Sequence, residues 1–289
     1  MTAMRAAKFI ARCLGCLAFA SAAIGAGGAP NLVPTQRNVV YGSDRAERYD
    51  VYAPHGVAHA PVVFFVHGGS WAHGDKASPG LLDAKLGRWL PEGYVVISVD
   101  YPLLPATQPP AQAREVARAL AYAQARAAEY GADPWRFIVM GHSAGAHLVA
   151  LIAASPTIAS DAGIVAPGAY VLLDTAALDV TALMQSRHLR LYERAFGTDP
   201  GRWAAESPMA LLARKGPPML VVCSTRRRIS CPDARQFVAK AKLLGTAATL
   251  LEEDLRHAEI NRTLGDPSAY TDAVDAFMRD SVTPGASMR

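Results

Sequence analysis

Acidic side chains are missing from the first thirty residues of this chain, and so is an apolar run long enough to span a bilayer. Three basic residues, Arg5, Lys8 and Arg12, precede an apolar run of about a dozen residues from Cys13 to Ile24, and small residues follow it. This order is typical of a secretory signal peptide. We therefore expect residues 1–29 to be a signal that is cleaved between Ala22 and Ala29, and an exported protein that is periplasmic or secreted.

The chain beyond residues 1–29 has almost no net charge. With three of the 29 basic residues removed, 26 remain against 25 acidic residues. A nearly neutral chain carries no charge pattern of the kind that attracts nucleic acid or an anionic membrane. We expect neither a nucleic-acid partner nor a membrane span, and the composition leaves the oligomeric state open.

Cysteines are scarce, and only two of the four lie beyond the predicted signal. Cys16 has no leucine three positions before it, which argues against a lipoprotein anchor. Cys223 and Cys231 stand eight positions apart, so in an exported protein they can form a disulfide. Two reduced thiols, with Cys223 buried on a strand, are the alternative that the sequence leaves open.

Internal repeats are absent as well, and the remaining chain alternates between buried strands and helices. Continuous apolar runs that predict buried strands are Pro61–Gly69, Tyr94–Pro102 and Arg136–Gly145. Further strands are predicted over Ala169–Asp174, Pro217–Ser224 and Ala248–Leu255. Glu47–Pro54 alternates like an early antiparallel strand. Helices are predicted over 77–89, 111–130, 232–244 and 268–279. This alternation predicts one α/β domain over residues 30–289 with a mainly parallel sheet, and a small cap insertion over residues 179–215.

The segment "GHSAG" (141–145) matches G-x-S-x-G where a predicted strand enters a predicted helix. In this motif the serine occupies a strained turn that projects its hydroxyl, and the flanking glycines avoid clashes. Ser143 is therefore the candidate nucleophile.

The segment "HGGSW" (67–71) follows a predicted strand and ends it with two glycines. Acyl transfer requires backbone N–H groups that stabilise an oxyanion, so we assign this role to Gly68, Gly69 and Ala144. We expect His67 to brace the loop. Trp71 lines the substrate pocket in one interpretation and packs beneath the cap in the other.

The candidate general base is His257 in "LRHAEIN", directly after the last predicted strand. Its position completes the chain order in which a nucleophilic serine precedes the histidine. The other histidines fit this position less well.

These segments, together with "VDYPLLP" and "GADPWRFIVMGHSAGAHLVALIA", resemble the esterase and arylformamidase branch of the α/β-hydrolase superfamily, related to hormone-sensitive-lipase-like and feruloyl-esterase-like enzymes. The resemblance covers about residues 62–265. It implies an α/β-hydrolase fold with an eight-stranded sheet and helices on both faces. It also implies hydrolysis of carboxylic esters or amides by a Ser-His-acid triad, with no metal and no organic cofactor. Pro102 stands where many relatives have arginine, which puts a family salt bridge in doubt.

The acid of that triad is missing from its expected place. In relatives it follows the next-to-last strand, which corresponds here to Arg228 or Ile229 in "TRRRISCPD". Asp233, in the same loop, is the favoured substitute, although Ser230 and Asp233 also resemble a helix capping box. Asp174 at the end of the preceding strand, Asp179 in the following turn, or no acid at all are the alternatives. The three arginines 226–228 suggest a solvated surface turn rather than a site for an anionic substrate.

The sequence thus predicts an exported serine hydrolase that cleaves small carboxylic esters through an acyl-enzyme on Ser143. An arylformamidase or amidase is the alternative among enzymes. A catalytically weak hydrolase-fold protein that binds a ligand or partner is the alternative of another class, because of the missing acid.

Overall fold

The computed structural model describes residues 33–283 of the chain. The predicted signal peptide, its cleavage region and the two N-terminal cysteines lie outside the described residues. None of the helices within residues 33–283 has the length and apolar character needed to cross a membrane.

Eight strands form one sheet in the order β1-β2-β4-β3-β5-β6-β7-β8. The strands are β1 (Gln36–Val40), β2 (Arg48–Tyr52), β3 (Ala60–Val66), β4 (Val95–Val99), β5 (Ala132–His142), β6 (Ala169–Leu173), β7 (Met219–Ser224) and β8 (Ala248–Glu253). β1 and β2 pair antiparallel, as do β2 and β4, and all the other neighbours are parallel. The predicted α/β-hydrolase fold and the predicted antiparallel early strand are therefore confirmed.

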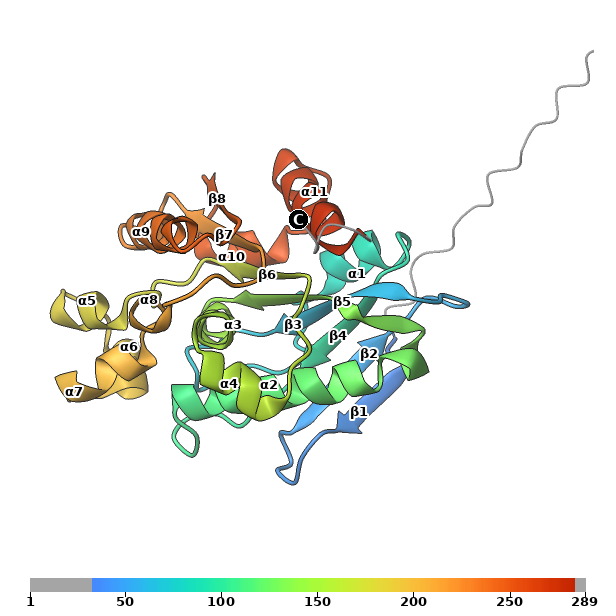
Figure 1. Cartoon of the computed structure of the whole chain (residues 1–289), viewed down its shortest axis with the longest axis horizontal. Helices are drawn as coiled ribbons and strands as arrows, with labels where there is room; N and C mark the ends of the chain where they lie inside the picture. Colours follow the sequence, from blue (N-terminus) through green and yellow to red (C-terminus); the bar gives the residue numbers. More distant parts are fainter. Residues whose placement is uncertain (1–32, 284–289) are drawn as a thin grey trace, which may run out of the picture.

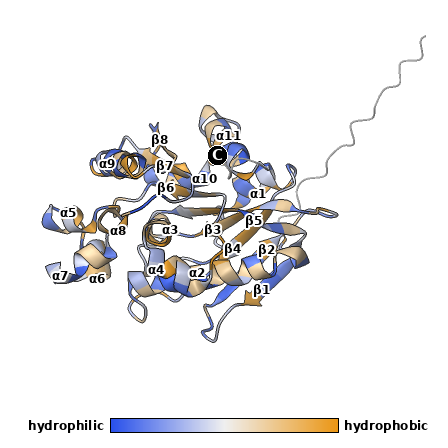
Figure 2. Cartoon of the chain, in the orientation of Figure 1, coloured by the Kyte–Doolittle hydropathy of each residue, from blue (hydrophilic) through white to orange (hydrophobic). Residues whose placement is uncertain are grey.

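The central strands form because their residues are apolar on both faces. Every residue of β4 and β6 is buried, and the colours of Figure 2 show the hydrophobic ribbon concentrated in the middle of the sheet. β1 differs from them, since most of its residues are exposed or only partly buried at the sheet edge. The continuous apolar pattern of the central strands is absent from β1, so the sequence pattern does not predict this strand.

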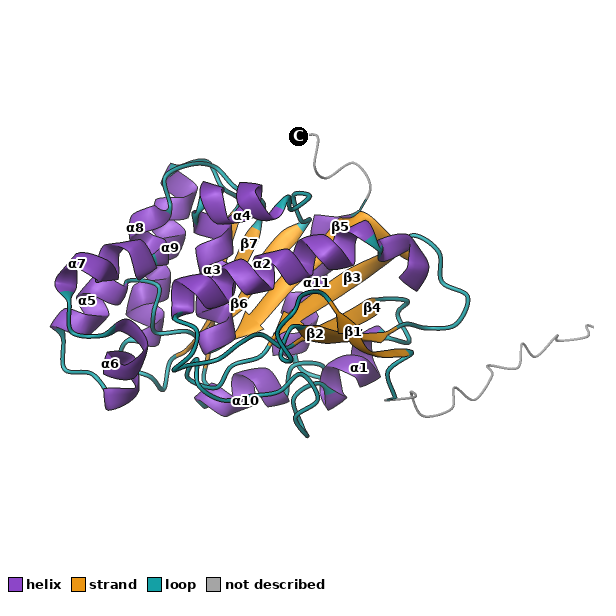
Figure 3. Cartoon of the chain, turned by 90° about the horizontal axis from the view of Figure 1, so that it is seen from below, coloured by secondary structure: helices purple, strands orange, loops and turns teal. Residues whose placement is uncertain are grey.

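Helices cover both faces of the sheet (Figures 1 and 3). One hydrophobic core includes side chains of α2 (Pro109–Ala125), α3 (Ala144–Ala154), α4 (Pro156–Ala162) and α9 (Ser230–Leu243). The other includes side chains of α1 (Asp83–Trp89), α10 (His257–Arg262) and α11 (Ala269–Val282). The predicted helix over 77–89 is shorter in the structure. The one over 111–130 divides into α2 and a 3₁₀ turn, η1 (Ala127–Tyr130), which ends at the left-handed Gly131.

The insertion between β6 and β7 contains short helices, as predicted. They are α5 (Val180–Gln185), α6 (Arg190–Phe196), α7 (Pro200–Trp203), η2 (Ala204–Glu206) and α8 (Pro208–Leu211). We call these residues, 180–211, the insertion. Figure 3 shows α5, α6 and α7 grouped together at one end of the molecule, beside α8 and α3. The insertion packs on the loop that follows β3, because the rings of Tyr192 and Phe196 contact Trp71.

Candidate active site

Ser143 occupies the sharp turn between β5 and α3. Its φ of 57° and ψ of −117° lie in a region that residues with a side chain rarely adopt. The turn is possible because both flanking glycines meet backbone: a Cβ on Gly141 would lie 2.4 Å from the Gly145 carbonyl oxygen, and one on Gly145 would lie 2.3 Å from that of Val66. The serine hydroxyl therefore stands at the carboxyl edge of the parallel strands, where α/β folds bind their ligands.

His257 begins α10 shortly after β8 and reaches Ser143 from the other end of the chain. Its Nε2 lies 2.8 Å from the Ser143 Oγ, and its Nδ1 lies 2.6 Å from the Asp174 Oδ2. Because an ionised carboxylate only accepts, Nδ1–H donates to Asp174, and Nε2 accepts the proton of the serine hydroxyl. The three side chains form one hydrogen-bonded chain in the arrangement that a Ser-His-acid triad requires.

Asp174 follows β6 directly and is fully buried, with a φ of 51°. Its Oδ1 accepts from the Ser224 N–H at 2.9 Å and from the Ser230 hydroxyl, while its Oδ2 accepts from His257 and Arg227. Burial by itself raises the pKa of this carboxyl. The hydrogen bond from His257, the charge of Arg227 and the bonds from Ser230 and Ser224 outweigh burial and hold the pKa well below its usual range. Asp174 is therefore ionised at neutral pH.

The expectation that Asp233 pairs with His257 is wrong. Asp233 lies in the first turn of α9 and accepts a hydrogen bond from the Asp179 backbone, and its Oδ2 has no partner among the described residues. Burial and the nearby charge of Asp179 raise the pKa of Asp233 to about 7. Asp179 caps the N-terminus of α5 by accepting from the Ala182 N–H, so it is not the partner of His257 either. The physical reason is that Asp174 extends directly from a strand adjacent to β5, whereas the helix directs Asp233 toward the insertion.

The loop after β3 lies against the serine, as expected for an oxyanion-binding loop. A Cβ on Gly68 would stand 2.9 Å from the Ser143 Cβ, and Gly69 has a φ of 125° that its lack of a side chain permits. The N–H of Ala144 belongs to the first turn of α3, where the helix itself offers no acceptor. The backbone of Gly68 and the N–H of Ala144 therefore lie close to Ser143, and Gly69 follows Gly68 in the same loop. His67 is buried beside them, stacked on Tyr101, and braces the loop.

Of the two interpretations of Trp71, the structure shows the second, because Trp71 packs beneath the insertion. It is 3% exposed, and its indole N–H donates to the His147 Nδ1 at 3.2 Å. His147 in turn donates from Nε2 to the Glu206 carbonyl oxygen, and burial lowers the pKa of its ring to about 4. This neutral histidine joins the glycine loop, α3 and the insertion through hydrogen bonds within a buried aromatic cluster.

His142, the residue before the serine, supports the other histidine. Its ring lies 4.6 Å from the ring of His257, and its Nε2–H donates to the backbone carbonyl of His257 at 3.0 Å. Burial, together with the charge of His257, lowers the pKa of His142 to about 3. His142 is therefore neutral over the working range of most hydrolases and adds no positive charge beside the imidazole.

The three arginines do not behave as one solvated turn. Arg226 is exposed and pairs with Asp254, and Arg228 is also exposed. Arg227, between them, turns inward and forms an ion pair with Asp174 at 2.9 Å. The prediction of a surface turn is thus wrong for this one residue, because the turn after β7 directs successive side chains to opposite sides.

Cys223 and Cys231 form a disulfide, which the sequence had left open. Cys223 lies near the end of β7 and Cys231 in the first turn of α9, so the bond closes the loop that carries Arg227 and Ser230. Both of these residues contact Asp174.

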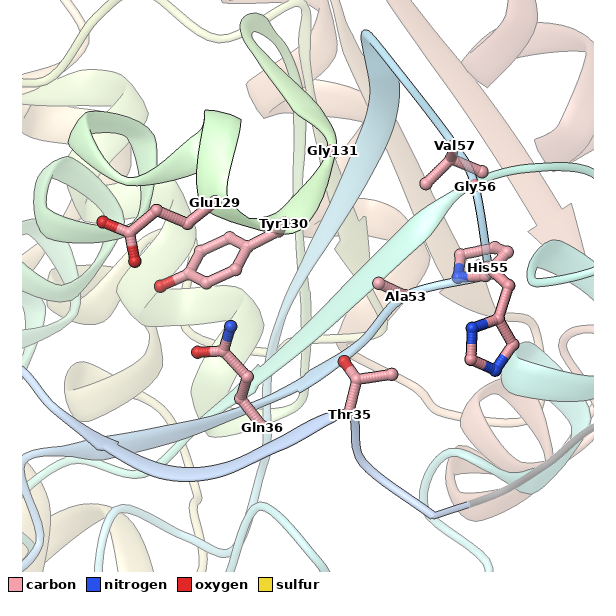
Figure 4. A pocket seen from close by; sticks show the side chains of 10 residues that line it. Thr35, Gln36, Ala53, His55, Gly56, Val57, Glu129, Tyr130 and Gly131 are labelled. Atoms are coloured by element: carbon pink, nitrogen blue, oxygen red, sulfur yellow. The ribbon is translucent and has the colours of Figure 1, made fainter.

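A hollow of about 370 Å³, shown in Figure 4, lies elsewhere on the molecule. It is lined by Thr35, Gln36, Ala53, Pro54, His55, Gly56, Val57, Glu129, Tyr130 and Gly131. Val57 precedes β3 and Gly131 precedes β5, so the hollow lies at the amino ends of these strands, opposite Ser143. Another hollow, of about 440 Å³, includes Gly74 and Tyr101 beside the carboxyl end of β4. Within residues 33–283, no group of three or more His, Cys, Asp or Glu side chains is arranged to hold a metal ion.

Comparison with known proteins identifies the family. The family model described as BD-FAE matches residues 49–229, more than half of the chain, including the glycine loop, Ser143 and Asp174. The chain belongs to the BD-FAE family. It lies within the esterase branch of the α/β-hydrolase superfamily, as the sequence resemblance implied.

Curated relatives of this BD-FAE protein include Esterase LipC of Mycobacterium tuberculosis, which is 30% identical over 223 residues, 72% of this chain and 55% of LipC. A probable isoprenylcysteine alpha-carbonyl methylesterase of Arabidopsis thaliana, ICMEL1, is 35% identical over 40% of this chain and 24% of its own length. The chain thus spans about half the length of LipC and a smaller part of ICMEL1.

Among solved structures, esterase 2 of Thermogutta terrifontis, phosphonylated by sarin, superposes with a TM-score of 0.70 at 23% identity. The match covers 88% of this chain and 99% of the esterase. At this level of identity it shows that the two proteins share a fold.

Proposed function

We propose that this BD-FAE protein is a serine hydrolase that cleaves small carboxylic esters. The observation that carries the proposal is the hydrogen-bonded chain Ser143–His257–Asp174 at the carboxyl edge of the sheet. Membership of the esterase branch supports it, and so does the similarity to a relative named Esterase LipC.

The proposed reaction has two halves. Ser143 Oγ attacks the ester carbonyl while His257 Nε2 takes the hydroxyl proton, and His257 then protonates the leaving alcohol. Asp174 holds the imidazole in the tautomer that accepts at Nε2 and stabilises the imidazolium. Water then attacks the acyl-enzyme with His257 as general base, and the acid and the free serine are regenerated.

The oxyanion of each tetrahedral intermediate would lie beside the glycine loop. We assign its donors to the backbone N–H groups of Gly68, Gly69 and Ala144, because Gly68 and Ala144 lie beside Ser143 and Gly69 continues the same loop. Such preorganised donors stabilise charge that develops in the transition state, and each is worth on the order of 3 kcal/mol.

Hydrolysis of p-nitrophenyl acetate and p-nitrophenyl butyrate tests the proposal. We expect turnover by the wild type and a loss in kcat of at least about a thousandfold in Ser143→Ala. The matched control is Ser160→Ala, because Ser160 is an exposed serine of α4. Wild-type turnover no faster than that of Ser143→Ala would refute the esterase.

A fluorophosphonate probe distinguishes the enzyme from a binding protein. We expect the probe to label the folded wild type at Ser143 and to leave Ser143→Ala unlabelled. The alternative of a weak, ligand-binding hydrolase fold was motivated by a missing acid. The bond from His257 to Asp174 removes that motivation. Hydrolysis of aryl formamides by the wild type would support the arylformamidase alternative.

We also propose export to the periplasm or beyond. The basic and then apolar order of residues 1–29 supports it, and so does the disulfide, since disulfides persist mainly in oxidising compartments. Expression in a bacterial host followed by fractionation and N-terminal sequencing checks this. Export with a new N-terminus between Ala22 and Ala29 is expected, and an uncleaved cytoplasmic product would contradict it.

A further inference from the structure

Arg227 lies against both partners of the proposed acid-base pair. Its NH1 donates to the Asp174 Oδ2 at 2.9 Å and to the Asp174 backbone oxygen at 3.0 Å, and it stands 3.1 Å from the His257 Nδ1. The Arg227 side chain is 27% exposed, whereas the Asp174 side chain is fully buried. A cation therefore lies beside the imidazole on the side opposite Ser143.

The protonation states determine what this contact does. A guanidinium only donates, and Nδ1 already carries the hydrogen that it donates to Asp174. NH1 and Nδ1–H therefore share Oδ2 as acceptor and do not bond to each other. Their proximity opposes the imidazolium that forms during catalysis, while the same arginine stabilises the carboxylate that the imidazolium needs.

The arginine is held in this position from several directions. It also donates to the Tyr192 hydroxyl of α6, which links it to the insertion. The neighbouring Arg226 fastens the loop to Asp254, and the disulfide from Cys223 to Cys231 closes it. Arg227 is thus a preorganised charge rather than a mobile surface side chain.

We propose that Arg227 is a positioning residue that completes the donor set of Asp174 and whose charge sets the acid limit of hydrolysis. This inference rests on the proposed esterase function. By opposing the imidazolium, the guanidinium keeps His257 available as a base at lower pH than a neutral side chain would.

Other titratable groups lie around Asp174, Arg227 and His257, and their titration must be separated from the effect of Arg227 on the pH profile. They are Lys85 of α1, His142 at the end of β5, Tyr192 of α6, Asp233 of α9, Glu253 of β8 and Tyr270 of α11. The pKa of His142 is about 3, and burial raises the pKa of both tyrosines, so these three keep one state across the assay range. The pKa values of Asp233 and Lys85 are about 7, so both titrate within it. Each Arg227 variant is therefore also measured in an Asp233→Asn background, while Lys85 is common to all variants.

The first experiment is the pH profile of kcat/KM for Arg227→Gln, which retains a donor without the charge, and for Arg227→Lys, which retains the charge. With Gln we expect the midpoint of the acid limb to move up by about one pH unit, since a charge a few ångströms away in a partly exposed site has an effect of that order. KM should change little. The midpoint for Lys should stay within about 0.3 unit of the wild type, and so should that for the matched control Arg228→Gln, because Arg228 is an exposed arginine of the same loop.

The second experiment does not need catalysis. Titration of His257 by NMR in protein with labelled histidine, assigned with His257→Gln, should show the same upward displacement in Arg227→Gln. Thermal unfolding checks that each variant is folded, and Arg227→Met is a second neutral variant should Gln fail to fold. An unmoved His257 titration in a folded neutral variant overturns the role of Arg227 even if the wild type is an active esterase. A displaced titration in a protein without esterase activity would instead refute the proposed function alone.

Discussion

The carboxylate of Asp174 is fully buried, and donors from separate segments surround it. A buried charge is tolerated only when its lone pairs are satisfied, because otherwise the group would bind a proton. Here Ser224, Ser230, Arg227 and His257 satisfy them. The geometry of the proposed triad is thus supported by the loops after β6, β7 and β8 together.

Asparagine substitutions test which of the two candidate aspartates, Asp174 or Asp233, acts as the carboxylate partner of His257. We expect Asp174→Asn to lower kcat by about 10⁴-fold, because the amide favours the wrong tautomer of His257. Asp233→Asn should leave kcat within about twofold, since Asp233 has no contact with His257 among the described residues. Steady-state kinetics on p-nitrophenyl butyrate measure both. Equal losses in the two variants would contradict the assignment.

Burial raises the pKa of Asp233 from its ordinary value of about 3.8 to about 7, which predicts a dependence of stability on pH. The unfolded chain binds the proton more weakly, so the contribution to stability is present below pH 4 and is lost as pH rises toward 7. Its upper bound is about 4 kcal/mol. Asp233→Asn should therefore unfold at a higher urea concentration than the wild type at pH 8 and show a smaller difference at pH 4. A difference that grows toward pH 4 would refute this.

At the scale of elements, the loop between β7 and α9 is the segment on which the site most depends. It presents Arg227 to Asp174, and Ser230, the first residue of α9, also donates to Asp174. The disulfide closes this segment over a separation of eight residues. Closing a loop of this length removes conformational entropy from the unfolded chain worth about 2.5 kcal/mol.

Removal of the disulfide should therefore lower both stability and activity. We expect Cys223→Ala combined with Cys231→Ala to lose about 2.5 kcal/mol in urea unfolding, and kcat/KM to fall because the donors of Asp174 become mobile. The wild type under a reducing agent is the matched control and should show the same loss. Unchanged stability in both samples would mean that the bond does not constrain the chain.

For the whole molecule, the insertion shares its hydrophobic core with the sheet. Tyr192, Phe196 and Trp203 of the insertion belong to the same buried cluster as the residues of α2 and α3. His147 adds hydrogen bonds between these parts. An element that contributes to a common core is expected to unfold with it.

We therefore expect residues 30–289 to unfold in one cooperative transition. Far-UV circular dichroism and tryptophan fluorescence should give the same midpoint, because Trp71 and Trp203 lie in the insertion contacts and Trp89 lies on the opposite face. A fluorescence transition at lower denaturant than the loss of helix would show that the insertion unfolds by itself.

Short sequence patterns were sufficient to identify the candidate nucleophile, the candidate base and the glycine loop. Each depends on a short pattern, such as a buried strand that ends in a glycine turn, and the turn geometry follows from the residues themselves. Ser143 and His257 are 114 residues apart, yet both could be named because each directly follows a recognisable strand.

Only the tertiary structure shows which carboxylate contacts His257, where Trp71 packs and which of the three arginines turns inward. These depend on which loops converge at the carboxyl edge. The sheet order places β6 between β5 and β7, so Asp174 adjoins the loops that carry Ser143 and Arg227. The aspartate that ends "AYVLLD" was the signal for it, but the sequence does not show which strands are neighbours in the sheet. Pairing between strands far apart in sequence is a property of the folded chain, so the choice between Asp174 and Asp233 required the structure.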